Sequence, residues 1–248
     1  MTTPDSTDFG YEKVTPEEKT RRVTRVFSSV TERYDLMNDV MSLGVHRLWK
    51  RYAVHLSGIR PDSAVLDVAG GTGDMAALYR PLLDERGRLV VSDINGDMLG
   101  RGRDRLLDAG LCGIEFVQAN AETLPFRRHS FDLVGIAFGL RNVTDKERAL
   151  ASMYDLLRYG GRIVILEFSK VVLPVLDRLY DTYSFRLIPL LGRLITGDED
   201  SYRYLVESIR MHPDQATLSA MLEDAGFSRV TCNNLSGGIV AIHRGYKL

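Results

Sequence analysis

The stretch that decides the fold runs from Ala64 to Asp93 and reads AVLDVAGGTGDMAALYRPLLDERGRLVVSD. It opens with a short apolar run, Ala64–Val68, that ends in a glycine turn, Gly70–Gly73. Apolar residues at helical spacing follow the turn, and a second apolar run ends at Asp93. A strand, a glycine turn, a helix and a second strand in this order are typical of the βαβ unit of a doubly wound sheet.

Three more apolar runs follow, and predicted helices separate them. These runs are almost continuously apolar, as expected when both faces of a parallel sheet are covered. They occupy residues 114–118, 131–136 and 162–167, with helices predicted over about 97–109 and 145–157. We therefore predict an α/β fold with a doubly wound, mostly parallel sheet joined by right-handed crossovers.

The end of the chain differs from a dinucleotide-binding fold. After a helix near 215–225, the runs 230–235 and 239–243 flank Ser-Gly-Gly, which predicts an antiparallel hairpin. A terminal hairpin of this kind is the usual finish of class I methyltransferases. The sequence therefore predicts their Rossmann-like fold, a seven-stranded sheet with a terminal antiparallel hairpin.

Two segments lie outside this predicted sheet. The first ten residues are interpreted as a flexible tail, and the capping box Thr15-Pro16-Glu17-Glu18 starts a helix. We divide the chain into an N-terminal tail and helical cap, 1–55, and a cofactor-binding domain, 56–248. This domain carries a predicted helical insertion, 170–212, after the fifth strand.

Composition excludes several classes of protein. The 248 residues are 44% hydrophobic and carry a net charge of −1, which argues against disorder and against a broad basic face for nucleic acid. Two cysteines cannot form a disulfide framework, and no apolar run reaches the length of about 18 residues of a membrane span. The five histidines show no metal-ligand spacing, so we expect no metal site. A soluble cytoplasmic protein is expected.

The glycine turn suggests a cofactor. Gly71-x-Gly73-x-x-Ala76 satisfies the dinucleotide fingerprint, and Asp93 follows at the distance of a ribose-binding acid. The pattern alone permits NAD, FAD or S-adenosylmethionine. Carboxylates at Asp67 and Asp74 would repel a pyrophosphate but attract the sulfonium and ammonium of S-adenosylmethionine, which we therefore prefer. The alternative is that Asp74 only caps its helix.

Each part of this cofactor has an expected contact. The turn of Gly70, Gly71, Thr72 and Gly73 would let the backbone approach the methionyl part, beside Asp67. Asp93 would bind the ribose hydroxyls. Asn120-Ala121-Glu122 follows the third strand, where an adenine edge would be recognised.

Several longer motifs carry a specific resemblance. YDLMNDVMSLGVHRLWK (34–50) and FGLRNV (138–143) closely resemble signatures of the ubiquinone/menaquinone biosynthesis C-methyltransferases. The resemblance extends from about Phe9 to the last residue. Further matching motifs are QANAE (118–122), LEFSK (166–170), DSYRYL (200–205), ESIRMHP (207–213) and HRGYK (243–247).

This resemblance implies a reaction and a substrate class. The family methylates a ring carbon of a polyprenylated benzoquinol or naphthoquinol and converts S-adenosylmethionine to S-adenosylhomocysteine. Its cofactor contacts correspond here to Thr72, Asp93, Asn120 and Ala121. Some members have a serine where this chain has Ala137. We include Ala137 among the expected cofactor contacts, although it lacks the hydroxyl group of that serine.

Ring methylation requires a group that stabilises a phenolate, because the ring carbon is otherwise a weak nucleophile. Arg141 follows the fourth strand, at the sheet edge where ligands bind, and could stabilise the oxyanion or order a water molecule. Asn142 can bond to a quinol oxygen. The resemblance implies that Tyr34 and Asn38 of the cap lie over the substrate. We therefore expect Arg141, Asn142 and Tyr34 to be catalytic. The same three residues and Asn38 are expected to bind the substrate. The alternatives are a structural ion pair for Arg141 and a packed ring for Tyr34.

The insertion has two interpretations. Leu173, Leu176, Leu179, Tyr180, Tyr183 and Leu187 recur at helical intervals. They would either line a polyprenyl channel that touches the inner face of the membrane, or form core packing or a dimer interface. A homodimer and an assembly with other quinone-biosynthesis proteins are both compatible with this pattern.

Other functions fit less well. A nucleic-acid methyltransferase would need an Asn/Asp-Pro-Pro-Tyr or Pro-Cys segment, and the chain has neither. A nicotinamide oxidoreductase is disfavoured by Asp74 and by the terminal hairpin. A non-catalytic subunit would not need Arg141-Asn142 beside an intact glycine turn. The remaining alternative is a methyltransferase acting on another small hydrophobic molecule.

Overall fold

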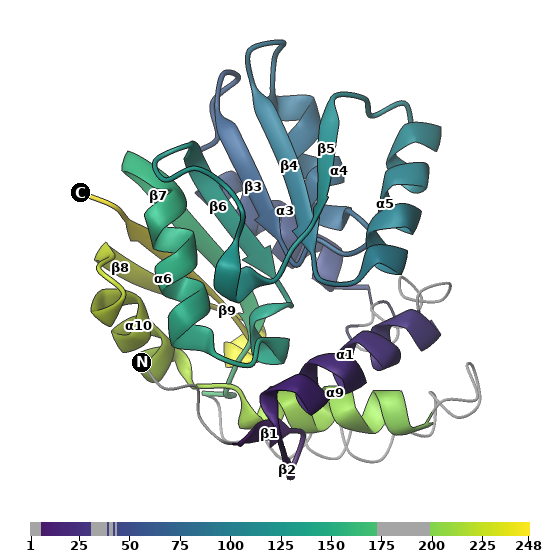
Figure 1. The fold of residues 1–248 in the computed structure, drawn as a ribbon. Helices are drawn as coiled ribbons and strands as arrows, with labels where there is room; N and C mark the ends of the chain where they lie inside the picture. Colours follow the sequence, from purple (N-terminus) through teal and green to yellow (C-terminus); the bar gives the residue numbers. More distant parts are fainter. Residues whose placement is uncertain (1–5, 31–38, 40–41, 43, 173–198) are drawn as a thin grey trace.

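The computed structural model describes residues 6–30, 39, 42, 44–172 and 199–248. Within these ranges the core is a seven-stranded sheet in the order β5-β4-β3-β6-β7-β9-β8 (Figure 1). All neighbours from β5 to β7 are parallel, whereas β9 is antiparallel to both β7 and β8. The predicted fold class is therefore confirmed. The strands are β3 (Ala64–Val68), β4 (Arg88–Asp93), β5 (Ile114–Gln118), β6 (Phe131–Ala137), β7 (Leu157–Phe168), β8 (Ser228–Leu235) and β9 (Val240–Tyr246).

Helices cover both faces of the sheet, as its apolar strands require. Neighbouring residues of β3 point to opposite faces, so Val65 packs in one apolar cluster and Leu66 in the other. The first cluster contains α3, α4 and α5, and the second contains α6 and α10. These helices are α3 (His46–Ser57), α4 (Asp74–Tyr79), α5 (Gly96–Asp108), α6 (Lys146–Leu156) and α10 (Gln215–Asp224). Short 3-10 turns complete the layers at η2 (Arg80–Leu82), η3 (Ala121–Thr123), η4 (Leu140–Asn142) and η6 (Ser236–Gly238).

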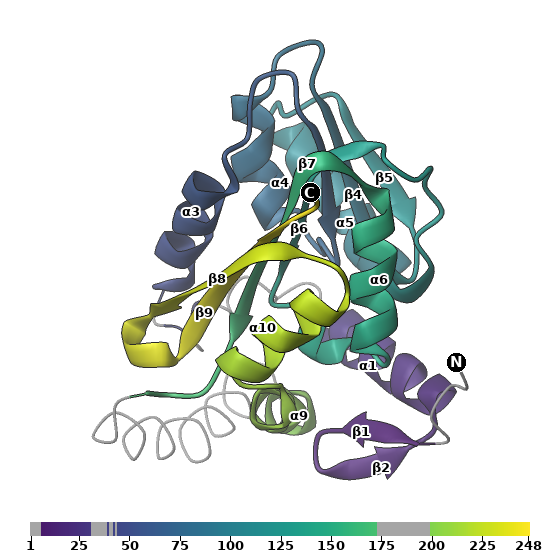
Figure 2. The same cartoon turned by 90° about the vertical axis from the view of Figure 1, so that its left-hand side faces the viewer.

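A third group of elements lies beyond the carboxyl ends of the central strands. Helices α1 (Pro16–Val30) and α9 (Glu199–Met211) run side by side there (Figures 1 and 2). Thr15 Oγ1 accepts a hydrogen bond from Glu18 N at 3.2 Å, which confirms the predicted start of α1. Helix α9 belongs to the predicted insertion, and the apolar stripe predicted over 173–187 lies outside the described residues.

The prediction of a flexible tail over the first ten residues is wrong for its second half. Strand β1 (Thr7–Phe9) pairs with β2 (Glu12–Val14) in an antiparallel hairpin. Phe9 stacks on Tyr204 of α9 with the ring centroids 4.2 Å apart, and Lys13 pairs with Asp8 at 2.7 Å. Tertiary packing on α9 therefore orders a segment whose polar composition resembles that of a tail.

Candidate active site

A hollow lies at the carboxyl ends of β3, β4 and β6, where open α/β sheets bind ligands. It measures about 790 Å³ including the part open to solvent, which is within the usual range of roughly 300–1,000 Å³ for ligand sites. Helix α1 closes one side of it. Its lining residues include Thr20, Val23, Thr24, Phe27, Ala69, Gly71, Asp93, Asn95, Asn120, Ala121, Phe138 and Asn142. We call this space the cofactor cavity.

Asp93 ends β4 at the wall of the cofactor cavity. Its Oδ2 accepts a hydrogen bond from Gly71 N at 3.0 Å, and its Oδ1 accepts one from Asn95 N at 2.8 Å. Burial raises the pKa of this carboxyl to about 6, although the backbone hydrogen bonds oppose that shift. A carboxylate fixed in this way retains lone pairs that can accept from two neighbouring hydroxyls, as a ribose diol requires.

A smaller hollow lies beneath the glycine turn and shares Ala69 and Phe138 with the cofactor cavity. Asp67 Oδ2 and Thr72 Oγ1 are buried there without a hydrogen-bond partner among the described residues. Burial, and next the nearby Asp93, raise the pKa of Asp67 to about 8. A carboxyl and a hydroxyl left unpaired beside the turn fit the ammonium and carboxylate of an amino acid, such as the methionyl end of S-adenosylmethionine.

Gly70 shapes the same hollow. A Cβ at this position would lie 2.6 Å from Val91 Cγ1 and 2.8 Å from Asp67 Oδ2, so any side chain would displace one of them. Ala137, also in the predicted set, lines this smaller hollow and not the cofactor cavity. Gly73 lines neither and is the N-cap residue of α4.

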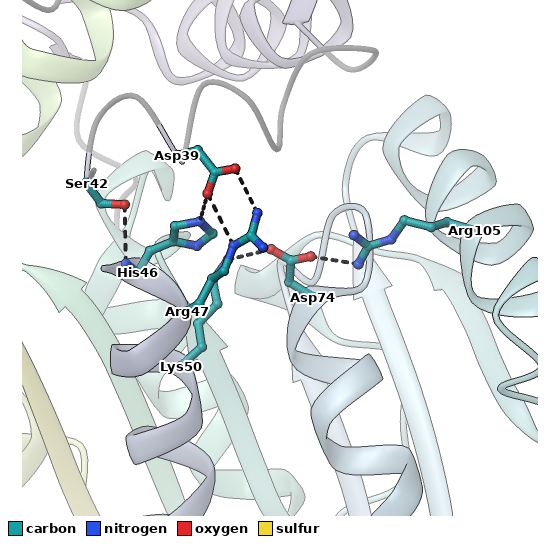
Figure 3. A network of polar contacts seen from close by, with 7 residues as sticks. All are labelled: Asp39, Ser42, His46, Arg47, Lys50, Asp74 and Arg105. Atoms are coloured by element: carbon teal, nitrogen blue, oxygen red, sulfur yellow. Dashed lines mark hydrogen bonds and ion pairs between the residues drawn. The ribbon is translucent and has the colours of Figure 1, made fainter. Parts of the chain in front are cut away.

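The role expected for Asp74 is corrected by the structure. Asp74 pairs with Lys50 Nζ of α3 at 2.5 Å and with Arg105 Nη2 of α5 at 2.7 Å (Figure 3). Burial alone would raise its pKa, but the two cations outweigh burial and lower the pKa to about 2. Its charge is thus already balanced by two cations. Asp67 and Asp93 form no ion pair with a described residue, and they line the smaller hollow and the cofactor cavity respectively.

The segment after β5 forms the far end of the cofactor cavity. Asn120 and Ala121 line it, and Asn120 Oδ1 accepts from Glu122 N at 3.0 Å, which holds the turn η3 in place. The Oε1 atom of Glu122 accepts from the backbone of Thr144 and Asp145 at the start of α6. Glu122 therefore supports the wall with this oxygen.

The two polar side chains of the FGLRNV motif, Arg141 and Asn142, lie in different environments. Asn142 lines the cofactor cavity, and its Oδ1 accepts a hydrogen bond from Tyr204 Oη at 3.0 Å. Arg141 lies behind it, 6% exposed, with Nη1 2.8 Å from Glu167 Oε1 and a further bond to Phe138 O. Glu167 Oε2 also accepts from Arg141 N at 3.2 Å. The structure brings Asn142 to the cavity and binds Arg141 into a buried ion pair.

Sequence reasoning did not identify three contributors to the site. The sequence predicted only that a helix starts at Thr15, yet the face of α1 around Val23 and Phe27 forms a wall of the cofactor cavity. Tyr204 and Glu167 were part of matching motifs, but no local pattern indicated their contacts with Asn142 and Arg141. The predicted substrate residues Tyr34 and Asn38 lie outside the described residues. Within the described ranges, no group of three or more His, Cys, Asp or Glu side chains could hold a metal ion.

The fold and the site together define an S-adenosylmethionine-dependent methyltransferase of class I. Within that class, the chain belongs to the ubiE/COQ5 methyltransferase family, whose model matches residues 15–247. The predictions of the family and of an S-adenosylmethionine-dependent enzyme are confirmed.

Individual relatives agree over nearly the whole chain. The ubiquinone/menaquinone biosynthesis C-methyltransferase UbiE of Ectopseudomonas mendocina is 58% identical over 98% of this chain and 95% of its own length. UbiE of Vibrio cholerae is 55% identical, with 98% and 94% covered. Among solved structures, a possible histamine N-methyltransferase from Thermotoga maritima matches with a TM-score of 0.65 at 18% identity, over 90% of this chain and 99% of that one. A methyltransferase from Aquifex aeolicus matches with a TM-score of 0.63 at 14% identity, over 86% and 98%. These two structures support the fold.

Proposed function

We propose that the chain transfers a methyl group to a ring carbon of a polyprenylated quinol in ubiquinone or menaquinone biosynthesis, with S-adenosylmethionine as the donor. The observation that carries the proposal is the shared space in which Asp93, the glycine turn and Asn142 meet at the carboxyl edge of the sheet. The full-length identity to enzymes named for this pathway supports the choice of substrate class.

The cofactor supplies an electrophilic methyl group on a sulfonium. Asp93 accepts from the ribose hydroxyls, while Asn120 and Ala121 contact the adenine. Asp67 and Thr72 bind the amino-acid end in the smaller hollow, where their polar atoms otherwise have no partner. The apolar face of α1 excludes water from the remaining space, which strengthens each of these contacts.

The substrate occupies the part of the cofactor cavity beside Asn142. Tyr204 donates to the Asn142 carbonyl, so the amide nitrogen is the atom left to donate to a quinol oxygen. Such a donor stabilises the negative charge that a phenolate carries when it activates the ring carbon. Arg141 acts as a positioning residue, because its bonds to Glu167 and Phe138 hold the segment that carries Asn142. Tyr34 and Asn38 of the cap contact the substrate from the opposite side.

Product analysis tests this function directly. The purified chain is incubated with methyl-labelled S-adenosylmethionine and, separately, a demethyl benzoquinol and a demethyl naphthoquinol. We expect a label on a ring carbon of at least one product, and a strong loss of that label in Asn142→Ala. Absence of label from both quinols, or label only on an oxygen, would refute the proposal.

We also propose that the protein works at the inner, cytoplasmic face of the membrane as a peripheral protein. No helix within the described ranges is long and apolar enough to cross a bilayer. On α3, Leu48 and Tyr52 are 61% and 40% exposed, and each directly follows an exposed arginine, Arg47 and Arg51 respectively. Apolar side chains among cations suit an anionic lipid surface. The homodimer and the assembly with other quinone-biosynthesis proteins stay predictions, and light scattering of the purified chain tests the first.

A further inference from the structure

A second polar cavity lies behind the segment that carries Asn142. It measures about 460 Å³ including its part open to solvent, and is bordered by the β1–β2 hairpin, α1, the start of α6 and α9. Figures 1 and 2 show these elements meeting below the sheet. The charged side chains that line it are Asp8, Lys19, Arg141 and Lys146. None of its lining residues except Thr144 also lines the cofactor cavity.

Two of these side chains are cations that form no ion pair within the described part of the chain. Lys19 Nζ donates to Val143 O at 3.1 Å, and Lys146 Nζ donates to the same carbonyl at 3.3 Å, so both ammonium groups meet at one point. Lys19 is only 2% exposed. Neither lysine has a carboxylate within ion-pair distance among the described residues, whereas Arg141 pairs with Glu167 and Asp8 pairs with Lys13.

This arrangement is unfavourable unless something compensates for it. Burial lowers the pKa of Lys19 to about 8, and the neighbouring Lys146 adds to the shift. Burial also lowers the pKa of Lys146, although carboxylates beyond ion-pair distance, Glu167 foremost, oppose that shift. Buried charges in proteins are normally paired, so two adjacent unpaired ammonium groups facing a polar space indicate a missing anion. The Thr144 hydroxyl lines the same space and can donate to that anion.

We propose that this second cavity binds a phosphate group, held between the ammonium groups of Lys19 and Lys146. A tetrahedral oxyanion has enough acceptor oxygens to satisfy both lysines and the Thr144 hydroxyl at once. The proposal does not depend on the identity of the methyl acceptor. With phosphate bound, the segment 141–144 would contact a ligand on each of its two sides. Asn142 and Val143 line the cofactor cavity, and Arg141 lines the second cavity. Phosphate should therefore also stabilise the wall that carries Asn142.

Calorimetry and thermal melting of the full chain test the proposal, with inorganic phosphate titrated at constant ionic strength against sodium chloride. We expect saturable binding and a higher melting temperature for wild type. Lys19→Met and Lys146→Met should each weaken binding at least tenfold. Arg21→Met is the matched control, because Arg21 is exposed on α1 and does not line the cavity, and it should bind as wild type does. Asp8→Asn removes the carboxylate from the cavity and should tighten binding.

Each outcome of these titrations either supports or overturns the proposed phosphate site. Absence of saturable phosphate binding by wild type, or equal binding by wild type and both lysine variants, would overturn the proposal. S-adenosylhomocysteine titrations of the same variants show that they are folded, and the opposite effect of Asp8→Asn gives a test that does not rely on a lysine variant. Glycerol 3-phosphate is titrated in parallel. Preference for it identifies a phosphomonoester as the ligand, and preference for inorganic phosphate identifies the free ion, each of which supports the site.

Discussion

Asp67 is a carboxyl group buried beneath the glycine turn, with a pKa raised to about 8. Between roughly pH 4 and pH 8, the unfolded chain has released this proton while the folded chain keeps it. Its contribution to the free energy of unfolding therefore falls as the pH rises through that window. The cofactor's ammonium would stabilise the ionised form, so the group is suited to binding rather than to the stability of the free protein.

Asp67→Asn removes this titration. In the absence of cofactor, we expect the melting temperature of the variant minus that of wild type to increase steadily from pH 4 to pH 8. Each kcal/mol corresponds to about 2–4 °C for a chain of this size. Asp93→Asn is the control, because the pKa of Asp93 is raised only to about 6. The melting temperature of this variant minus that of wild type should therefore stop increasing near pH 6. A difference for Asp67→Asn that does not change with pH would contradict the raised pKa.

Tyr204 matters through the side chain that it orients. Tyr204→Phe removes one hydrogen bond to Asn142 and leaves the ring stacked on Phe9. We expect kcat to fall about tenfold, the effect of losing one well-placed hydrogen bond, with S-adenosylhomocysteine affinity changed less than twofold. Steady-state kinetics and calorimetry measure the two quantities. Tyr154→Phe, whose hydroxyl lies away from the site, is the control. An equal loss of kcat and cofactor affinity would indicate a merely structural role.

At the scale of elements, Asp74 joins three helices. It begins α4 and pairs with Lys50 of α3 and Arg105 of α5 (Figure 3). Lys50 also lies 5.8 Å from the centre of the Phe138 ring, which borders both the cofactor cavity and the smaller hollow. The ion pairs therefore hold the glycine turn against its neighbours rather than attract the cofactor.

A double-mutant cycle tests this role of Asp74. Asp74→Asn leaves the buried Lys50 ammonium unpaired, and we expect a loss of about 3–5 kcal/mol in the free energy of unfolding. Lys50→Met combined with Asp74→Asn should recover much of that loss, since no unpaired charge remains buried beside Phe138. Urea denaturation measures Asp74→Asn, Lys50→Met and the double variant, which together complete the cycle. Asp104→Asn, which breaks an exposed pair with Arg103, should cost at most about 1 kcal/mol. A double variant no more stable than Asp74→Asn would disprove the coupling.

The elements also show where sequence reasoning works and where it stops. Ala64–Val68 was predicted with its observed bounds, because a buried parallel strand is a local apolar run and the glycine turn marks its end. The partners of Asp74 and Arg141 were not predictable in the same way. Lys50 is 24 positions from Asp74 and Glu167 is 26 from Arg141, so their pairing arises only when the sheet forms. The sequence therefore showed which side chains are charged, but it did not show which partners they contact in the fold.

The N-terminal region shows the same contrast between local and long-range information. Its helix start was predicted from a local capping box, whereas the β1–β2 hairpin depends on Phe9 packing against Tyr204, nearly 200 residues away. Helix α1 lines both the cofactor cavity and the second cavity, and the second cavity is also bordered by the β1–β2 hairpin and by Tyr204. The cap is thus part of the binding machinery and not a cover added to a complete domain.

Helix α3 presents two exposed apolar side chains, Leu48 and Tyr52, on one side of the molecule. Leu48→Asp combined with Tyr52→Asp puts charge on an apolar patch while leaving the buried side of the helix, Trp49 and Ala53, in place. We expect the double variant to co-sediment far less with vesicles containing anionic lipid, because it loses both apolar insertion and attraction to the surface. Its rate on a short-chain quinol presented in detergent should stay near that of wild type. Leu107→Asp is the control, because Leu107 is a leucine of α5 that is 53% exposed, and this variant should sediment normally. If all three proteins sediment alike, α3 is not the membrane-facing surface.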